Sequence, residues 1–265
     1  MVALENMKRR MTQKSFAIAL VAALALLGPN ARGQISITGG GGLTYSQNFD
    51  TLTRNTTAET WVNDADTTSA IDSPQRIGLL GWYCGSFGTT FTTPQIRAGT
   101  GSSTTGAFYS FGLTPVSDRA LGTLPSDASA SASMRIGARF VNNTGETITG
   151  LTLSYDGEQW RQAAVTAINN SYTVAYAIFG AGSGTLNPAA GVYTTITSAE
   201  FNTPQDGNGT GVALDGNLTA NRVAGLSGTV TGLSVANGEE IRSSRHIRKA
   251  HGCAPTLEVF RGEYA

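Results

Sequence analysis

The hydrophobic pattern is clearest in the stretch Thr147-Ile-Thr-Gly-Leu-Thr-Leu-Ser-Tyr155. Its apolar side chains recur with the period of two that is typical of a half-buried β-strand, and Gly150 marks a potential bulge. The polar stretch Val141-Asn-Asn-Thr-Gly-Glu146 precedes it and has the composition of a turn. A second alternating stretch, 134–142, lies before that turn. We therefore predict that residues 134–155 form a β-hairpin.

The same alternation recurs along the rest of the chain, interrupted by Gly, Asn, Asp and Pro. No amphipathic helix is indicated after the N-terminal segment. Short strands separated by turns favour an all-β fold, and we expect an antiparallel β-sandwich of the jelly-roll kind. The expected strands are 43–49, 77–84, 95–98, 107–112, 120–124, 134–142, 147–156, 172–179, 193–197 and 227–235.

The N-terminus has the three parts of a secretory signal peptide, residues 1–33. Basic residues up to Lys14 precede the uncharged apolar stretch 16–27, and Gly28-Pro29 and the small residues of Ala31-Arg32-Gly33 follow. A retained membrane anchor is the alternative, but an apolar stretch of this length spans roughly 18 Å, short of the ~30 Å hydrocarbon core. We expect cleavage after Gly33 and a periplasmic, cell-surface or extracellular location. Membrane contact is then limited to this segment before cleavage.

Composition divides the remaining chain into three parts. A Gly-rich linker, 34–42, is expected to lead into one β-sandwich domain, 43–241. Residues 242–265 form an atypical basic tail that begins with Arg242-Ser-Ser-Arg-His-Ile-Arg-Lys. The tail contains both histidines of the chain and a lysine, a residue type that the preceding domain lacks.

The charge of the expected domain excludes one class of function. From Ile35 to Ile241 the chain has no lysine, and its eight arginines face fifteen acidic residues, for a net charge of −7. Binding to nucleic acid by phosphate neutralisation needs a basic surface. We therefore expect no nucleic-acid partner for this domain.

The residue types needed for common catalytic and metal sites are scarce. The chain has two cysteines, Cys84 and Cys253, and its histidines are His246 and His251. A Ser-His-Asp triad would need a histidine within the domain, and no Cys/His spacing matches a metal site. We interpret Cys84 as a buried thiol, although an exported pair of cysteines could also form a disulfide. No catalytic residue is predicted.

Two pairs of opposite charges lie close together in the sequence, Asp118 with Arg119 and Glu158 with Arg161. A carboxylate and a guanidinium can form two parallel hydrogen bonds, so we interpret both pairs as structural ion pairs that tie strands together at the sandwich rim. A role in a binding site is the alternative. Asp156 and Glu158 would also lie on one strand face, which leaves open a pair of acid–base carboxylates.

Aromatic residues near these charges suggest a platform for sugar rings. The candidate ligand-binding residues are Trp82, Tyr83, Tyr155 and Trp160. Packing of these side chains on one another is the simpler interpretation.

One loop resembles the first half of a calcium-binding loop. In Asp206-Gly-Asn-Gly-Thr-Gly211, the side-chain oxygens of Asp206, Asn208 and Thr210 alternate with glycines. The twelfth position, where a bidentate acid is needed, is Asn217. An ordinary β-turn fits better, and calcium is the one cofactor that we consider.

Several motifs, taken in order, carry a family resemblance. From 34 to 241 the chain resembles a group of uncharacterised secreted bacterial β-sandwich proteins of the PEP-CTERM or autotransporter-associated type. Members of this group occur alone, with a C-terminal sorting segment, or beside an extracellular nuclease domain, and the resemblance implies no catalytic residues. The motifs are Tyr45-Ser-Gln-Asn-Phe-Asp-Thr-Leu52, Gly81-Trp-Tyr83, Ser117-Asp-Arg-Ala-Leu-Gly122, Gly137-Ala-Arg-Phe-Val-Asn-Asn-Thr-Gly145 and Tyr155-Asp-Gly-Glu-Gln-Trp-Arg161.

The resemblance ends at Ile241, where members of the group continue into further strands. We hypothesise that a frameshift replaced the native C-terminus there, and a genuine basic tail is the alternative. The other reading frames of the gene test this, since one of them should encode an apolar, Asp-rich strand pair. The sandwich is expected to lack its last strands and to expose an edge.

These observations favour a secreted or cell-surface module with a structural or ligand-binding role and no catalysis. Its expected partner is a surface glycan or a matrix component. Two alternatives remain open. The chain could be a carbohydrate-binding module, or the accessory domain of an extracellular hydrolase or nuclease whose catalytic part is missing.

Overall fold

The computed structural model describes residues 33–39, 44–60, 79–87, 95–125, 133–164, 170–187, 193–248 and 257–264. The predicted signal peptide, except Gly33, lies outside these residues, as do Cys253 and His251. The described residues contain two short 3₁₀ turns, η2 (Thr197–Ala199) and η3 (Thr219–Asn221), and otherwise strands and loops. None of their helices is long and apolar enough to cross a membrane.

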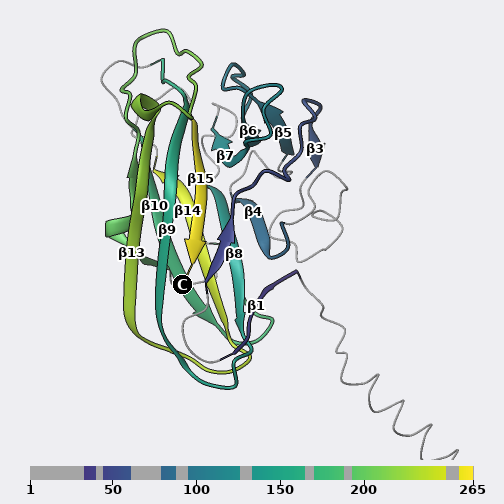
Figure 1. Ribbon diagram of the computed structural model, residues 1–265, viewed down its shortest axis with the longest axis vertical. Helices are drawn as coiled ribbons and strands as arrows, with labels where there is room; N and C mark the ends of the chain where they lie inside the picture. The colour runs from purple at the N-terminus through teal and green to yellow at the C-terminus, as the bar shows by residue number, and fades with distance from the viewer. Residues whose placement is uncertain are drawn as a thin grey trace, which may run out of the picture. The chain divides into compact units, whose positions relative to one another are not determined.

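Two sheets make up the fold, which confirms the all-β class (Figure 1). The 7-stranded sheet has the order β1 (Ile35–Ile37), β8 (Ser133–Asn142), β14 (Glu240–Arg248), β10 (Ser171–Phe179) and β11 (Thr194–Thr195), with β12 (Phe201–Asn202) on β10 and β4 (Trp82–Phe87) on β8. The 8-stranded sheet has the order β13 (Arg222–Val235), β9 (Ile148–Arg161), β15 (Leu257–Tyr264), β7 (Ala120–Leu124), β6 (Ala107–Phe111), β5 (Gln95–Gly99) and β3 (Glu59–Thr60), with β2 (Tyr45–Gln47) on β15.

The sheets are mixed rather than purely antiparallel. β1 pairs with β8 in parallel, and β5 pairs with β6 in parallel. The remaining pairs of strands are antiparallel. A parallel neighbour needs a crossover connection, and the loop 100–106 between β5 and β6 supplies one.

The predicted hairpin over residues 134–155 is wrong, because β8 and β9 belong to different sheets. The turn between them crosses from one sheet to the other around buried Asn142. Its side-chain amide donates to the carbonyls of Glu146 (2.7 Å) and Val235 (2.8 Å). Both strands still bury their apolar faces in one core, Ile136 from one side and Leu153 from the other. Alternation identified the buried faces correctly, but not the neighbouring strand.

The expectation that the sandwich lacks its last strands is also wrong. β14 continues past Ile241 and lies between β8 and β10, and β15 lies between β9 and β7. Arg242 and Arg245, assigned to the tail, are each 1% exposed. Residues 242–248 and 257–264 therefore fill interior positions of the two sheets, whatever the origin of their coding sequence.

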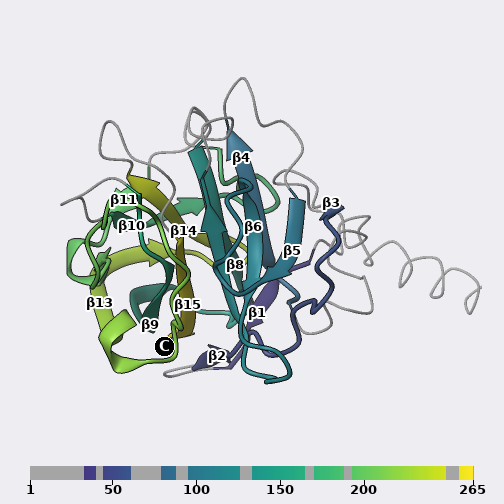
Figure 2. The same ribbon diagram turned by 90° about the horizontal axis from the view of Figure 1, so that it is seen from above.

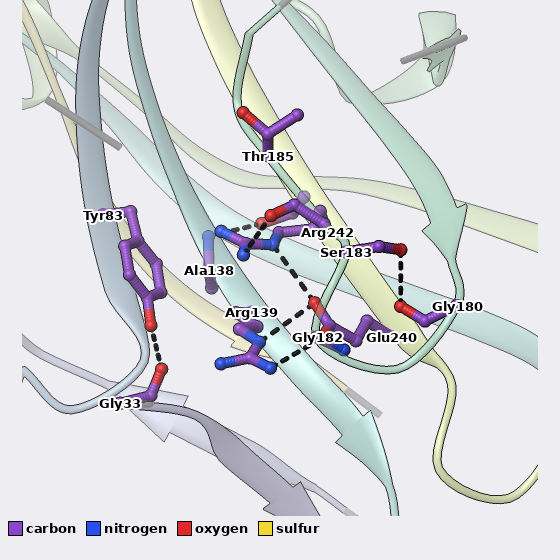
Figure 3. Close-up of polar contacts among 12 residues, drawn as sticks. Gly33, Tyr83, Ala138, Arg139, Gly180, Gly182, Ser183, Thr185, Glu240 and Arg242 are labelled. Carbon is purple, nitrogen blue, oxygen red and sulfur yellow. Dashed lines mark hydrogen bonds and ion pairs between the residues drawn. The ribbon is translucent and has the colours of Figure 1, made fainter. Parts of the chain in front are cut away.

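The predicted linker 34–42 begins with part of the fold. Ile35 and Ile37 of β1 pair with Phe140 and Asn142 of β8. Gly33 is buried, and its carbonyl accepts a hydrogen bond from the Tyr83 hydroxyl (Figure 3). The first strand thus starts within the stretch that composition marks as flexible.

Candidate functional site

The four aromatic residues predicted to form a sugar platform are all buried, so they present no exposed ring face. Trp82 packs edge-to-face on Phe49, with ring centroids 4.8 Å apart, and its indole N–H donates to the Tyr45 hydroxyl at 2.9 Å. The Arg245 guanidinium lies 5.6 Å from the centroid of the Trp82 ring and 5.1 Å from that of Tyr155. Trp82 and Tyr155 therefore both contact the same cation of the chain itself.

A buried cluster of charges lies on the face of β8 and β14 that is opposite to the face carrying Arg245 (Figure 3). The Arg139 guanidinium donates to both carboxylate oxygens of Glu240, at 2.6 and 3.0 Å, and Arg242 Nε lies 3.5 Å from the same carboxylate. Burial alone would lower the pKa of Arg139, but the hydrogen bonds and the negative charge of Glu240 raise it overall. Arg242 also stacks 4.8 Å above the Tyr83 ring.

The same cluster fastens the loop that follows β10. The Gly182 amide donates to Glu240 at 2.5 Å, and Arg242 donates to the Gly184 carbonyl at 2.6 Å (Figure 3). Gly184 leaves room for these side chains, since a Cβ there would lie 2.5 Å from Glu240 Oε2. The contacts of the cluster within the described residues hold the fold together and bind loop 180–187 to the sheet.

Neither predicted ion pair is present among the described contacts. Arg119, which is 3% exposed, donates to the hydroxyl and the carbonyl of Ser110, and its own amide donates to Asp50. Burial, together with the nearby charge of Arg54, lowers the pKa of Arg119 to about 10. The Glu158 carboxylate accepts from the Trp160 indole, whereas the Arg161 guanidinium donates to loop carbonyls. Proximity in the sequence therefore did not predict the partner of either residue.

Arg161 instead joins two loops at the end of β9. Its guanidinium donates to the Gly101 carbonyl at 3.0 Å and to the Gly211 carbonyl at 3.2 Å. Burial lowers the pKa of Arg161, and the nearby Tyr109 partly offsets this effect. The Gln162 side chain adds a 2.6 Å hydrogen bond to the Asp206 carbonyl. We call loops 100–106 and 203–218, together with this end of β9, the β9 loop end.

Three aromatic rings lie beneath these loops. Tyr109 stacks on Phe111 at 4.8 Å, and Phe111 stacks on Trp160 at 6.1 Å. They form a second apolar cluster, separate from the main core, because β6 is buried on both of its faces. Sequence reasoning missed Tyr109 and Phe111. Their alternation in Ala107-Phe-Tyr-Ser-Phe111 was visible, but nothing in it told a second cluster from the core.

Glu158 is a buried acidic residue of this region. Its carboxylate accepts a hydrogen bond from the Trp160 indole at 3.0 Å. The pKa of Glu158 is raised to about 7, chiefly by burial; the Trp160 hydrogen bond and Arg222 partly offset this rise, and the charges of Asp156 and Asp215 add to it. Asp156 accepts from the Gly225 amide at 2.8 Å, so each member of the predicted carboxylate pair has a hydrogen bond within the fold.

The calcium-like loop is an Asx turn. Asn208 Oδ1 accepts hydrogen bonds from the backbone amides of Thr210 (3.0 Å) and Gly211 (2.9 Å), and from the Thr210 hydroxyl (3.2 Å). The oxygen that a calcium site would use therefore already has donors. The part of the chain that the structure describes contains no group of three or more His, Cys, Asp or Glu side chains placed to hold a metal ion. These contacts favour the turn interpretation.

Gly101 provides a test of how closely the loops approach β9. A Cβ at Gly101 would lie 1.7 Å from the Trp160 carbonyl oxygen, whereas a Cβ at Gly145 would have no neighbour within 4 Å. Both glycines have positive φ, 81° and 83°. We expect Gly101→Ala to lower the free energy of unfolding by about 1–3 kcal/mol more than Gly145→Ala does, in urea denaturation. Equal losses would contradict a tight contact at Gly101.

The fold and the site define a mixed-sheet, all-β protein with a loop end fixed by buried polar side chains. No family model matches the sequence, and no curated protein matches it in sequence. Among solved structures, the K1 cleaved adhesin domain of Lys-gingipain from Porphyromonas gingivalis W83 is 13% identical, with a TM-score of 0.31, and the match covers 84% of this chain and 98% of that one.

Two other solved structures are similarly distant. The match to the carbohydrate-binding module TmCBM61, solved in complex with β-1,4-galactotriose, has 10% identity and a TM-score of 0.24, and covers 56% of this chain and 70% of that one. The match to the enzymatically active domain of tailspike protein 4 of bacteriophage CBA120 has 9% identity and a TM-score of 0.35. It covers 77% of this chain and 21% of the tailspike chain.

Proposed function

We propose that this chain is an exported, non-catalytic binding module that recognises an uncharged glycan or matrix polymer through its β9 loop end. The observation that carries the proposal is that buried side chains fix the loops of this end. Arg161 links both loops, and Gln159 exchanges hydrogen bonds of 2.8 and 2.9 Å with the backbone of Gln205. Binding residues are commonly presented by loops on a rigid scaffold, and loops that are already ordered lose less entropy on binding.

The exposed residues of the β9 loop end suit a neutral, hydroxyl-rich ligand. Asn208 and Thr210 are exposed and can exchange hydrogen bonds with hydroxyl groups, while Val212 and Leu218 are exposed apolar side chains, at 40% and 55%. From Ile35 to Ala265 the chain has thirteen basic and seventeen acidic residues, and this net charge of −4 disfavours polyanions. We therefore favour uncharged polysaccharides over acidic ones.

A glycan array, followed by calorimetry on any hit, tests the proposal. We expect Val212→Ser combined with Leu218→Ser to weaken binding at least tenfold without lowering the melting temperature. Val116→Ser is the matched control, because Val116 is an exposed apolar side chain (44%) on the β6–β7 loop. Binding that is unchanged in the double variant would contradict the location, and no binding to any neutral glycan would contradict the ligand class. Trp160→Ala is unsuitable as a test, since it removes a buried ring.

Export is tested by sequencing the N-terminus of the protein recovered outside the cytoplasm. Cleavage after Gly33 gives Gln34 as the first residue and removes the carbonyl that accepts from Tyr83. Recovery of the full-length chain in the cytoplasmic fraction would contradict export.

A further inference from the structure

β13 is a long strand at one edge of the 8-stranded sheet. It runs over 14 residues and pairs with β9 along one side, from Arg222 opposite Glu158 to Val235 opposite Ile148. Among the described residues, no strand pairs with its other side. β13 and β3, the two ends of the 8-stranded sheet, lie at opposite margins of the view in Figure 2.

The sequence of this edge lacks most of the usual protection against pairing with another chain. The turn η2 does pack on β13, since a Cβ at Gly228 would lie 2.3 Å from Ile196, but it covers the buried face at Gly228 and not the opposite, exposed face. Natural edge strands carry lysine, proline or inward-facing charges, or are interrupted by bulges. From Val223 to Val235 the sequence has no charged residue and no proline. β13 does have register shifts near Gly225 and Gly232, both with positive φ, but between them the register is continuous from Leu226 to Thr231. At ~3.4 Å per residue, a regular edge of about 20 Å remains.

The side chains of this section suit a strand of the same sequence. Ser227, Thr229 and Thr231 are exposed on one face, and the Thr229 hydroxyl lies 3.1 Å from that of Thr152 on β9. In an antiparallel pair, residues directly opposite each other share a face. A two-fold axis at Thr229 therefore places Thr229 opposite its copy and Ser227 opposite Thr231, so hydroxyl groups meet hydroxyl groups.

The absence of charged side chains from this section makes a second copy of the chain the favoured partner. A strand that pairs with itself antiparallel about a two-fold axis brings each charge on one copy near the same charge on the other, which destabilises the pair. The section 226–231 has no charge to repel its copy. We propose that two copies of this chain associate through their β13 edges, joining the two 8-stranded sheets into one continuous sheet.

Sedimentation velocity of the purified chain over a concentration series tests this association. We expect a monomer–dimer equilibrium, because an edge of this length buries less surface than a permanent interface does. Thr229→Lys and Thr229→Glu should each shift the chain to monomer, since each brings like charges together at the axis. Thr152→Lys is the control, because Thr152 lies on the same face but on β9, away from the edge.

Mixing the two charged variants gives the sharpest result. Native mass spectrometry should show a Thr229→Lys/Thr229→Glu heterodimer and few homodimers of either variant. The proposal is overturned if the wild-type chain stays monomeric at the highest soluble concentration, if Thr152→Lys abolishes the dimer as Thr229→Lys does, or if the mixture gives no heterodimer. Unchanged circular dichroism and melting temperature establish that the variants fold, and Ser227→Glu provides a second charged edge should Thr229→Glu not fold.

Discussion

Replacing Glu240 with glutamine is expected to lower the free energy of unfolding by about 3–5 kcal/mol. Glu240 is 0% exposed, and its carboxylate contacts the guanidinium groups of Arg139 and Arg242, which are 3% and 1% exposed. Glutamine keeps the size of the side chain but removes the negative charge that stabilises both cations in a medium of low polarity. Urea unfolding at pH 7 measures the loss.

Two comparisons make this test specific. Glu146→Gln is the control, because Glu146 is exposed in the β8–β9 turn, and it should change stability by less than about 0.5 kcal/mol. In a double-mutant cycle, Arg139→Met combined with Glu240→Gln should lose less stability than the sum of the single losses, since the cation and its partner are removed together. Additive losses, or a loss below about 1 kcal/mol for Glu240→Gln, would contradict the assigned contacts.

Replacing Glu158 with glutamine is expected to raise the free energy of unfolding at pH 8 by about 3 kcal/mol. Burial holds the pKa of Glu158 at about 7, above its ordinary value, so the folded chain binds a proton that the unfolded chain releases. The stability of the wild-type chain therefore falls as the pH rises from about 4.5 to about 7, by ~1.4 kcal/mol per unit of pKa difference. Above pH 7 both states are ionised, and the full loss is present.

Glutamine does not titrate in this range and can still accept the Trp160 hydrogen bond. The two proteins should therefore be similarly stable at pH 4 and diverge as the pH rises, in urea unfolding at pH 4, 6 and 8. Glu146→Gln again serves as the control and should follow the wild-type curve. The prediction is refuted if Glu158→Gln has the same pH dependence as the wild-type chain.

The candidate site was only partly visible in the sequence. Trp160 and Arg161 were selected as candidates, and both lie in the β9 loop end. Trp160 is buried under Gly216, which agrees with the packing interpretation and not with a sugar platform, and Arg161 bonds to loop carbonyls instead of Glu158. These carbonyls, of Gly101 and Gly211, lie far from Arg161 in the sequence. No local pattern identifies a backbone carbonyl as the partner of a distant arginine.

The basic tail shows even more clearly that local sequence does not identify distant partners. Arg242 and Arg245 belong to a basic stretch whose composition is typical of a solvated segment. Glu240 is the only nearby residue in the sequence that forms a buried ion pair with either of them among the described contacts. The tertiary structure places them between β8 and β10, where Glu240, Tyr83 and Trp82 surround them. Composition reports the average environment of a residue type, and a charged side chain departs from that average once a specific partner is buried with it.

The sequence by itself determined the all-β class and the buried face of strands such as 147–155, where Leu151, Leu153 and Tyr155 all enter the core. Alternation with a period of two follows from the pleat of a single strand, so it does not depend on which strands are its neighbours. Only the tertiary structure decided that this stretch pairs with β13 and β15 instead of β8, and that residues after Ile241 complete both sheets. The reason is physical: the pleat fixes which side of a strand is buried, whereas its neighbours are selected by contacts between residues distant in the chain.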